Sequence, residues 1–327
     1  MGNFTFKGLF LAGLFMVLGC LSIQAADDDG LITKQITIKL EKAGTLPNKI
    51  GSTKKFQITN LKIIGEINGT DLCFIREMAG SDREGWRTEG KLATLDLSGA
   101  KIVRGGGIYY NSVNCYTSDD VIGNYAFSDC SGLTSLILPS SVTSIGSSAF
   151  SGCSGLTSLT LPSSVTSIGS SAFEACYGLF SLTLPSSVTE IGESAFRGCS
   201  SLASLTLPSS VTSIGKSAFE GCSGLTSIYV SWESPLSIDA STFKDANTGK
   251  CILYVPKGTY DDYWLSNWGI FENIVEYDAT GIDHITTSGE AKEISRYAAD
   301  GQRLEVPAKG LNIVKYSDGC VKKVVVQ

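Results

Sequence analysis

The sequence predicts a mainly β fold in which short coils of chain stack on one another, with short helices capping the ends. Two residue types recur every 23 positions, and the residues between them repeat in the same order. They are the cysteines Cys130, Cys153, Cys176, Cys199 and Cys222 and the prolines Pro139, Pro162, Pro185 and Pro208. A fixed period of about 20 to 29 residues with an L-x-x-L-x-L core is typical of a leucine-rich repeat solenoid. Parallel strands joined by short connections are expected to form right-handed coils.

Each regular unit predicts two short strands. In the unit that begins at Cys153, Leu159 points inward from the first strand, and Pro162 ends it where a missing donor does no harm. Ile168 begins a second short strand, and Phe173 folds back into the core. Because each coil buries its apolar side chains only against its neighbours, stability is a sum of nearest-neighbour contacts.

The number of strand triplets sets the expected length of the stack. Apolar triplets begin at positions 61, 95, 136, 159, 182, 205, 228 and 252, which predicts eight coils. At roughly 4.8 Å between neighbouring strands, the stack is on the order of 40 Å long. We expect a curved rod whose two ends need cover.

The chain divides into five predicted parts. They are a signal peptide at 1–25 (alternatively a lipoprotein signal at 1–19), an N-terminal cap with the first irregular coil at 31–90, a solenoid of 23-residue units at 91–255, a C-terminal aromatic cap at 256–280 and a small β module at 281–327. In the N-terminal cap, residues 36–40 alternate like an edge strand, and residues 71–78 predict a short capped helix.

Three further segments carry structural expectations. An insertion at 104–120, with three consecutive glycines, predicts a projecting loop of the kind that often determines specificity. Aromatic residues at 260–271 predict a helix over the last coil, in which Trp264 and Trp268 pack as a cap. After Gly281, short alternating segments separated by turn signals predict strands.

The N-terminus predicts export. Lys7 precedes an apolar run at 9–18, which is a secretory signal pattern and is shorter than the roughly 20 residues of a transmembrane helix. Cleavage after Ala25 and cleavage before Cys20, in a sequence that looks like a bacterial lipobox, remain open; the second makes Cys20 a lipidation candidate. Any membrane attachment is expected through a lipid anchor or a sorting signal.

Composition excludes several classes of protein. The chain has 327 residues, 43% hydrophobic and 18% charged, which excludes global disorder. Its formal net charge of −6 gives no electrostatic footprint for nucleic acid or anionic lipid. We therefore expect no nucleic-acid partner.

The repeat L-x-x-L-x-L-P-x-S-V-x-x-I-G-x-x-A-F-x-x-C resembles the BspA-like leucine-rich repeats of bacterial surface proteins of the Bacteroidetes type, over about residues 128–255. The resemblance implies a secreted or outer-membrane cell-surface protein that functions in adhesion and protein binding, with host matrix proteins among its ligands. Because the motif positions are core positions, no binding residue is carried over. The tail at 297–326 is similar to C-terminal sorting domains of the type IX secretion route; a β accessory domain is the alternative.

The cysteine column predicts buried free thiols. Stacking at about 4.8 Å places the Cβ atoms of equivalent cysteines beyond the roughly 3.5 to 4.5 Å that a disulfide prefers. Four cysteines lie outside the column, and the sequence assigns them no partner. They are Cys73, Cys115, Cys251 and Cys320.

The sequence predicts no enzyme. His284 is the only histidine, so Ser-His or Cys-His catalysis has a single possible base. The acid pairs at 119–120 and 261–262 are typical of solvated turns, and the glycine triplet lacks a following Lys-Ser/Thr. We expect no catalytic residue, no metal and no cofactor.

The outward positions of the strands are the candidate binding surface, expected on a concave face. These positions carry hydroxyl and aromatic side chains and almost no charge. They are Ser135, Ile137, Ser158, Thr160, Ser181, Thr183, Ser204, Thr206, Ser227, Tyr229 and Tyr254, with Trp232 beside them. We expect an adhesin-like protein that binds an extracellular protein or glycan. The alternatives are a structural spacer, for which the hydroxyls are inert, and a dedicated glycan-binding module.

Overall fold

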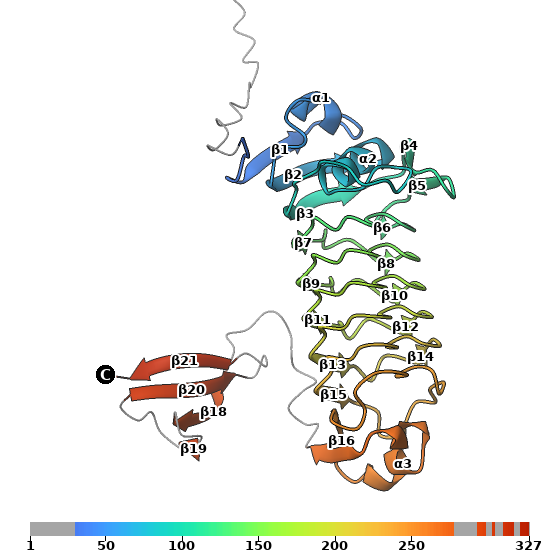
Figure 1. The fold of residues 1–327 in the computed structure, drawn as a ribbon, viewed down its shortest axis with the longest axis vertical. Helices are drawn as coiled ribbons and strands as arrows, with labels where there is room; N and C mark the ends of the chain where they lie inside the picture. The colour runs from blue at the N-terminus through green and yellow to red at the C-terminus, as the bar shows by residue number, and fades with distance from the viewer. Residues whose placement is uncertain (1–29, 278–292, 299–302, 305–309, 317–320, 327) are drawn as a thin grey trace, which may run out of the picture.

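The computed structural model describes residues 30–277 and four strand segments at 293–298, 303–304, 310–316 and 321–326 (Figure 1). It confirms the mainly β fold of stacked parallel coils. The predicted signal peptide, Cys20, His284 and Cys320 lie outside the described residues. No helix among the residues described is long and apolar enough to cross a membrane.

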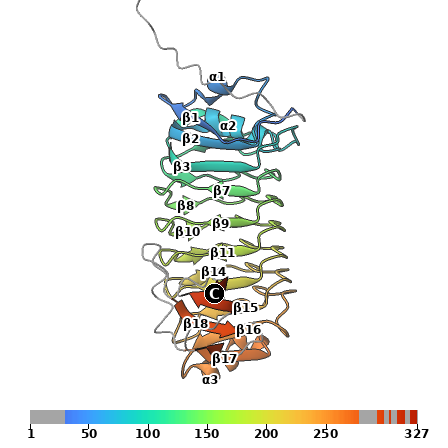
Figure 2. The same cartoon turned by 90° about the vertical axis from the view of Figure 1, so that its left-hand side faces the viewer.

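One parallel sheet of ten strands runs the length of the solenoid (Figure 1, Figure 2). In spatial order its strands are β1 (Ile36–Leu40), β2 (Asn60–Ile67), β3 (Thr94–Ile102), β7 (Ser135–Ile137), β9 (Ser158–Thr160), β11 (Ser181–Thr183), β13 (Ser204–Leu207), β15 (Ser227–Val230), β16 (Ile252–Pro256) and β17 (Asn273–Tyr277). The predicted edge strand is β1, whereas β17 was not predicted because it lacks the leucine triplet. The sheet therefore has two strands more than the eight coils expected. The stack shows little curvature in either view, so the expected curved rod is wrong.

A second, narrower sheet lines the other side of the coils. Its strands are β6 (Val121–Ile122), β8 (Ser144–Ile145), β10 (Ser167–Ile168), β12 (Glu190–Ile191) and β14 (Ser213–Ile214). The predicted strand at Ile168 is β10, which pairs in register with β8 and β12. Gly169 follows it, and a Cβ atom there would lie 2.6 Å from the backbone of Gly146. The coils can approach this closely only because the residue has no side chain.

Phenylalanine rings form a continuous stack through the core. The rings of consecutive coils lie 5.1 to 5.4 Å apart between centroids, with interplanar angles of 2° to 10°. They belong to Phe127, Phe150, Phe173, Phe196, Phe219 and Phe243, all buried. Such pairs contribute roughly 0.5 to 1.5 kcal/mol each beyond their buried area. The stack thus ties each coil to both neighbours.

The cysteine column lies beside these rings. The column cysteines are buried and free, which confirms the predicted thiols, and Cys73, Cys115 and Cys251 are free as well. Cys176 Sγ donates to the carbonyl oxygen of Phe150, in the preceding coil, at 3.2 Å. The thiols at positions 153, 199 and 222 make the same bond at 3.0 to 3.2 Å. These four thiols are therefore satisfied donors between coils.

Two helices close the N-terminal end, α1 (Leu46–Ile50) and α2 (Gly69–Met78). The predicted capped helix is α2, which begins two residues before the predicted start. The Asn68 side chain accepts from Thr70 N at 3.0 Å. The buried Asp71 carboxylate accepts from the backbone amides of Gly44, Leu46 and Asn68 at 2.5, 2.9 and 3.0 Å. One carboxylate thereby joins the starts of both helices.

The insertion is an ordered hairpin, so the predicted projecting loop is wrong. Strands β4 (Gly105–Tyr110) and β5 (Cys115–Thr117) pair in antiparallel fashion. Gly107 N donates to Thr70 Oγ1 at 3.0 Å, and buried Tyr109 donates to the carbonyl of Asn124 at 2.8 Å. A Cβ atom on Gly106 would lie 2.4 Å from Asn68 Oδ1. The glycines therefore allow the hairpin to approach the cap of α2.

The C-terminal end is covered by a short helix α3 (Tyr260–Trp264), a 3-10 helix η1 (Asn267–Ile270) and β17. Trp268 is fully buried and donates Nε1 to the carbonyl of Leu236 at 2.8 Å, as expected of a cap residue. Trp264 is 49% exposed, so its predicted packing is wrong. Ser266 accepts from Trp268 N and starts a new helix, so the two tryptophans do not share one helix face.

In the segment predicted to be a small β module, four strands form one antiparallel sheet. They are β18 (Glu293–Ala298), β19 (Arg303–Leu304), β20 (Gly310–Tyr316) and β21 (Val321–Val326), in the order β19-β18-β20-β21.

Candidate functional site

The candidate site is the outward surface of strands β7 to β16, which we call the sheet face. Register pairing aligns its side chains in two columns along the stack. Ser158 pairs with Ser135 and Ser181, and Thr160 pairs with Ile137 and Thr183. The structure brings every predicted binding residue except Trp232 onto this face. Ile252, which pairs with Ser227, also lies in the serine column and was missed.

Hydroxyl groups on the sheet face are available to a partner. Ser158, Thr160, Ser181 and Thr183 are exposed, and their hydroxyls make no hydrogen bond within residues 30–277. On this face the Ser227 hydroxyl does bond, to Ser204 Oγ at 3.1 Å.

Hydroxyls elsewhere in the same coils behave differently. Ser187 donates to the carbonyl of Val165 at 2.6 Å, and Thr189 donates to that of Thr166 at 3.2 Å. These hydroxyls tie one coil to the preceding coil. A single residue type therefore has two duties: some hydroxyls tie coils together, whereas those of Ser158, Thr160, Ser181 and Thr183 on the sheet face stay unbonded within residues 30–277.

Charged side chains lie away from the sheet face. One ion pair lies just beyond its N-terminal end, on β2 and β3, where Lys62 Nζ is 2.7 Å from Asp96 Oδ2. Burial disfavours the Asp96 carboxylate, but hydrogen bonds from Lys62 and Ser98 outweigh it and lower its pKa. Another set of charges lies in the turns after the core phenylalanines, where Arg197 is 3.5 Å from Glu174 and 3.9 Å from Glu220. The outward positions from β7 to β16 carry no ionised side chain.

Tyrosines form the C-terminal end of the sheet face. The rings of Tyr229 and Tyr254 stack at 4.4 Å between centroids, and Tyr277 meets Tyr229 edge-on at 6.0 Å. Burial, and then the neighbouring Tyr254, raise the pKa of Tyr229. Because the rings hold one another in place, a partner that contacts them loses little side-chain entropy on binding.

Trp232 belongs to the C-terminal cap instead. Its indole Nε1 donates to the carbonyl of Val211 at 2.9 Å, and its ring lies 6.0 Å from that of Trp268. The residue follows β15, after the chain has left the strand, so strand alternation no longer directs its side chain outward. The prediction that it lies beside the binding face is not supported by this placement.

Two exposed aromatic residues beside the sheet face were missed. Phe180 is 63% exposed and directly precedes β11, and Tyr177 is 55% exposed in the turn before it. The preceding unit has Ser154 and Thr157 at these positions, and the Thr157 hydroxyl bonds to the carbonyl of Thr134 at 3.1 Å. The sequence contained the signal for these two residues, because Tyr177 and Phe180 replace hydroxyl residues of the preceding unit with aromatic ones.

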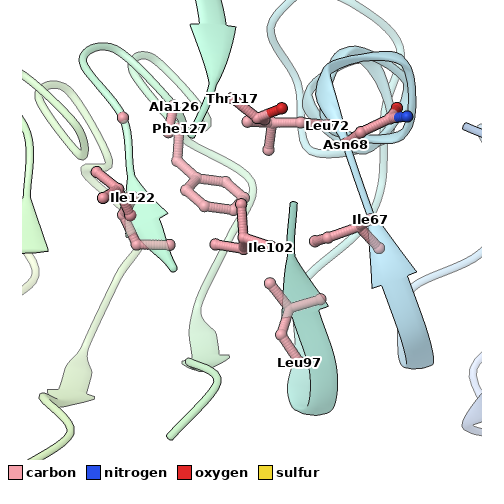
Figure 3. A pocket seen from close by; sticks show the side chains of 11 residues that line it. Ile67, Asn68, Leu72, Leu97, Ile102, Thr117, Ile122, Ala126 and Phe127 are labelled. Carbon is pink, nitrogen blue, oxygen red and sulfur yellow. The ribbon is translucent and has the colours of Figure 1, made fainter. Parts of the chain in front are cut away.

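An apolar cavity lies between the N-terminal cap and the first regular coils (Figure 3). Ile67, Leu72, Ile102 and Phe127 line it, and their side chains converge in the close-up view. Its volume of about 10 Å³ leaves room for one water molecule at most. The cavity therefore offers no ligand site, and within the described part of the chain no group of three or more His, Cys, Asp or Glu residues could hold a metal ion.

Comparison with known proteins agrees with this geometry. Residues 120–249 match the model of the BspA type leucine rich repeat region in six copies. This part of the chain is a BspA-type leucine-rich repeat region. Repeat folds of this kind generally present extended binding surfaces and are not built around a reactive centre. No curated protein matches the sequence.

Solved bacterial leucine-rich repeat proteins are similar to the chain. A leucine-rich repeat protein of T. pallidum is 30% identical, with 48% of this chain and 62% of that chain covered and a TM-score of 0.34. The pneumococcal vaccine antigen PcpA is 18% identical, over 75% and 68% of the two chains, with a TM-score of 0.42. A leucine-rich repeat protein of Bacteroides ovatus is 15% identical, over 76% and 84%, with a TM-score of 0.24. This chain thus spans less than two thirds of the T. pallidum protein.

Proposed function

We propose that the protein is an exported cell-surface protein that binds host or bacterial surface macromolecules on its sheet face, in the manner of an adhesin. One observation carries the proposal. Hydroxyls of the sheet face, such as those of Thr160 and Thr183, are exposed and unbonded, whereas hydroxyls such as that of Ser187 tie coils together. The BspA-type repeat region supports a binding role.

The chemistry of the face favours an extended, uncharged partner surface. Columns of hydroxyls offer hydrogen bonds at regular intervals along the stack, and no charge on these strands steers a partner. Aromatic side chains at Phe180 and at the Tyr229–Tyr254 stack supply contact area of the kind that dominates binding energy. An extracellular protein or glycan can present hydrogen-bonding groups to the hydroxyl columns and apolar surface to the aromatic side chains.

The location is part of the proposal. An N-terminal secretory signal supports export, and either a lipid on Cys20 or a tail-directed sorting step would attach the chain to the surface. Mass spectrometry of the mature N-terminus distinguishes a lipidated Cys20 from cleavage after Ala25. An intact Met1 on protein recovered from cells would refute export.

A binding array tests the function. The full chain is applied to immobilised fibronectin, collagen, mucin and dextran, and a binding curve is measured for each surface that retains it. The double variant Tyr177→Ser, Phe180→Thr restores the residues of the preceding unit, so the coil should keep its fold. We expect at least tenfold weaker binding.

The matched control is Glu193→Ser, which restores the preceding unit's residue on a different surface and should bind like the natural chain. Binding to none of the four surfaces, or equal binding by both variants, would refute the proposal.

The near-identity of the middle units favours a second candidate, a spacer that holds the tail away from the cell. Removing residues 153–175 deletes one whole unit and leaves both exposed aromatics in place. A spacer tolerates this deletion with no loss of affinity on the array. A sheet face that binds an extended ligand should lose affinity, because the deletion removes one residue from each of its two columns.

A further inference from the structure

The C-terminal cap of the solenoid carries an exposed apolar patch. Leu265 is 83% exposed, Trp264 49%, Ile270 43% and Tyr260 40%. Tyr260 and Trp264 stack at 6.4 Å between ring centroids. We call these four residues the cap patch. They lie within eleven positions on α3, η1 and the turn between them, and such concentrated exposure marks a surface that something covers.

The cap is also acidic. Residues 256–277 contain Lys257 against Asp261, Asp262, Glu272 and Glu276, one basic group against four acidic groups. Asp261, Asp262 and Glu272 are exposed. A second copy of the same cap would bring like charges together, which disfavours self-association through the patch.

The C-terminal sheet has complementary properties. Strands β18 to β21 form a single layer in Figure 1, and a sheet needs a second element on which to bury one face. These strands contain five basic residues against one acidic residue, Glu293. The basic residues are Arg296, Arg303, Lys315, Lys322 and Lys323. In a chain with a formal net charge of −6, this excess of basic groups is local.

The chain itself brings the two surfaces together. Residues 278–292 join β17 to β18, and fifteen residues span at most roughly 50 Å. Because both surfaces belong to one chain, their contact is intramolecular, and a weak contact is sufficient for docking.

We propose that the C-terminal sheet docks on the cap patch, covering its apolar side chains and pairing its basic residues with the acidic groups of the cap. Docking would hold the tail at a fixed place on the solenoid. The inference does not depend on the proposed binding function, because it concerns only contacts within the chain.

Zero-length crosslinking tests the docking. A water-soluble carbodiimide activates a carboxylate, a neighbouring lysine amine attacks it, an amide forms, and the reagent leaves as a urea. We expect amides that join Lys315, Lys322 or Lys323 to the cap carboxylates Asp261, Asp262 or Glu272. The ion pair of Lys62 and Asp96, 2.7 Å apart, is an internal reference within the same sample.

Two variants and one mixing control complete the test. The double variant Trp264→Ser, Leu265→Ser should lower the cap-to-tail amides at least fivefold while the reference amide is unchanged. The variant Phe180→Thr removes an exposed aromatic side chain beside the sheet face and should change the yield of neither the cap-to-tail amides nor the reference amide. Reference amides without cap-to-tail amides would overturn the proposal. Amides that join isotopically labelled to unlabelled chains would also overturn it, since they would identify a second copy as the occupant.

Discussion

Single residues set how closely neighbouring coils approach. At position 169 the backbone of the preceding coil occupies the space that a side chain would need. At position 175 the demand is conformational: Ala175 has φ of 58°, and the equivalent Gly152, Gly198 and Gly221 have φ of 71° to 75°. Left-handed backbone costs a non-glycine residue roughly 1 to 2 kcal/mol. Two substitutions between glycine and alanine in one coil therefore have opposite predicted signs.

Gly169→Ala should lower the free energy of unfolding by roughly 1 to 3 kcal/mol, because its Cβ atom would lie 2.6 Å from backbone atoms. Ala175→Gly should raise it by about 1 kcal/mol. Urea denaturation followed by circular dichroism measures both. Stabilisation by Gly169→Ala, or destabilisation by Ala175→Gly, would contradict the packing described.

Buried thiols predict an alkaline loss of stability. Burial raises the pKa of Cys130 from 9.0 to about 11 and the pKa values of Cys176 and Cys222 to about 12. A raised pKa means that the protonated thiol is favoured in the folded state, so its stability contribution is complete below about pH 9 and is lost as pH rises toward 11 to 12.

Urea midpoints measured from pH 8 to 11 should therefore fall above pH 9. In Cys176→Ala the fall should be smaller, since one titrating thiol is removed. If the urea midpoint fell equally steeply with pH in the natural chain and in Cys176→Ala, the thiols would be excluded as the cause.

At the scale of elements, the strands could be predicted wherever the 23-residue pattern held, because the pattern itself encodes burial. Leu159 and Ile168 lie on strands as expected. The prediction failed where contacts between distant segments decide the structure. Gly106 suggested a loop, yet it allows the hairpin to pack on the cap of α2. Trp264 was expected to pack as part of the C-terminal cap, but the chain starts a new helix at Ser266 and leaves Trp264 49% exposed.

The candidate surface could be located from strand alternation, and the departure of Tyr177 and Phe180 from the repeat was visible in the sequence, but the bonding of its hydroxyls could not be predicted. Which hydroxyls bond within the solenoid depends on the path of the turns, which a single sequence does not reveal. Trp232 was misplaced for the same reason, since it lies in a turn after β15.

The N-terminal cap should depend on one carboxylate. Asp71→Asn keeps the size of the side chain, but it replaces a charged acceptor of three backbone amides with one carbonyl and a donor. Hydrogen bonds to charged groups contribute roughly 1.5 to 3 kcal/mol each, so we expect a loss of at least about 2 kcal/mol in the free energy of unfolding. Asp262→Asn, at an exposed position, is the control and should change stability by less than about 0.5 kcal/mol. A loss of the same size in both variants would argue against the cap's role.

At the scale of the whole molecule, charge lies away from the sheet face, which fixes how binding should respond to salt. Between 50 and 500 mM salt, affinity for a ligand found on the array should change by less than about threefold, because few charged pairs are screened. Titrations at several ionic strengths measure this. A loss of tenfold or more would mean that a charged surface, such as the cap, makes the contact.

The most direct test of the central claim is to block the sheet face and measure binding. Thr160→Arg with Thr183→Arg places two long charged side chains at exposed, unbonded positions in the middle of the face. Glu190→Arg places one at an exposed position on β12 of the second sheet. With circular dichroism unchanged, we predict at least tenfold weaker binding for the sheet-face variant and unchanged binding for Glu190→Arg. Undiminished affinity of the sheet-face variant would contradict the account.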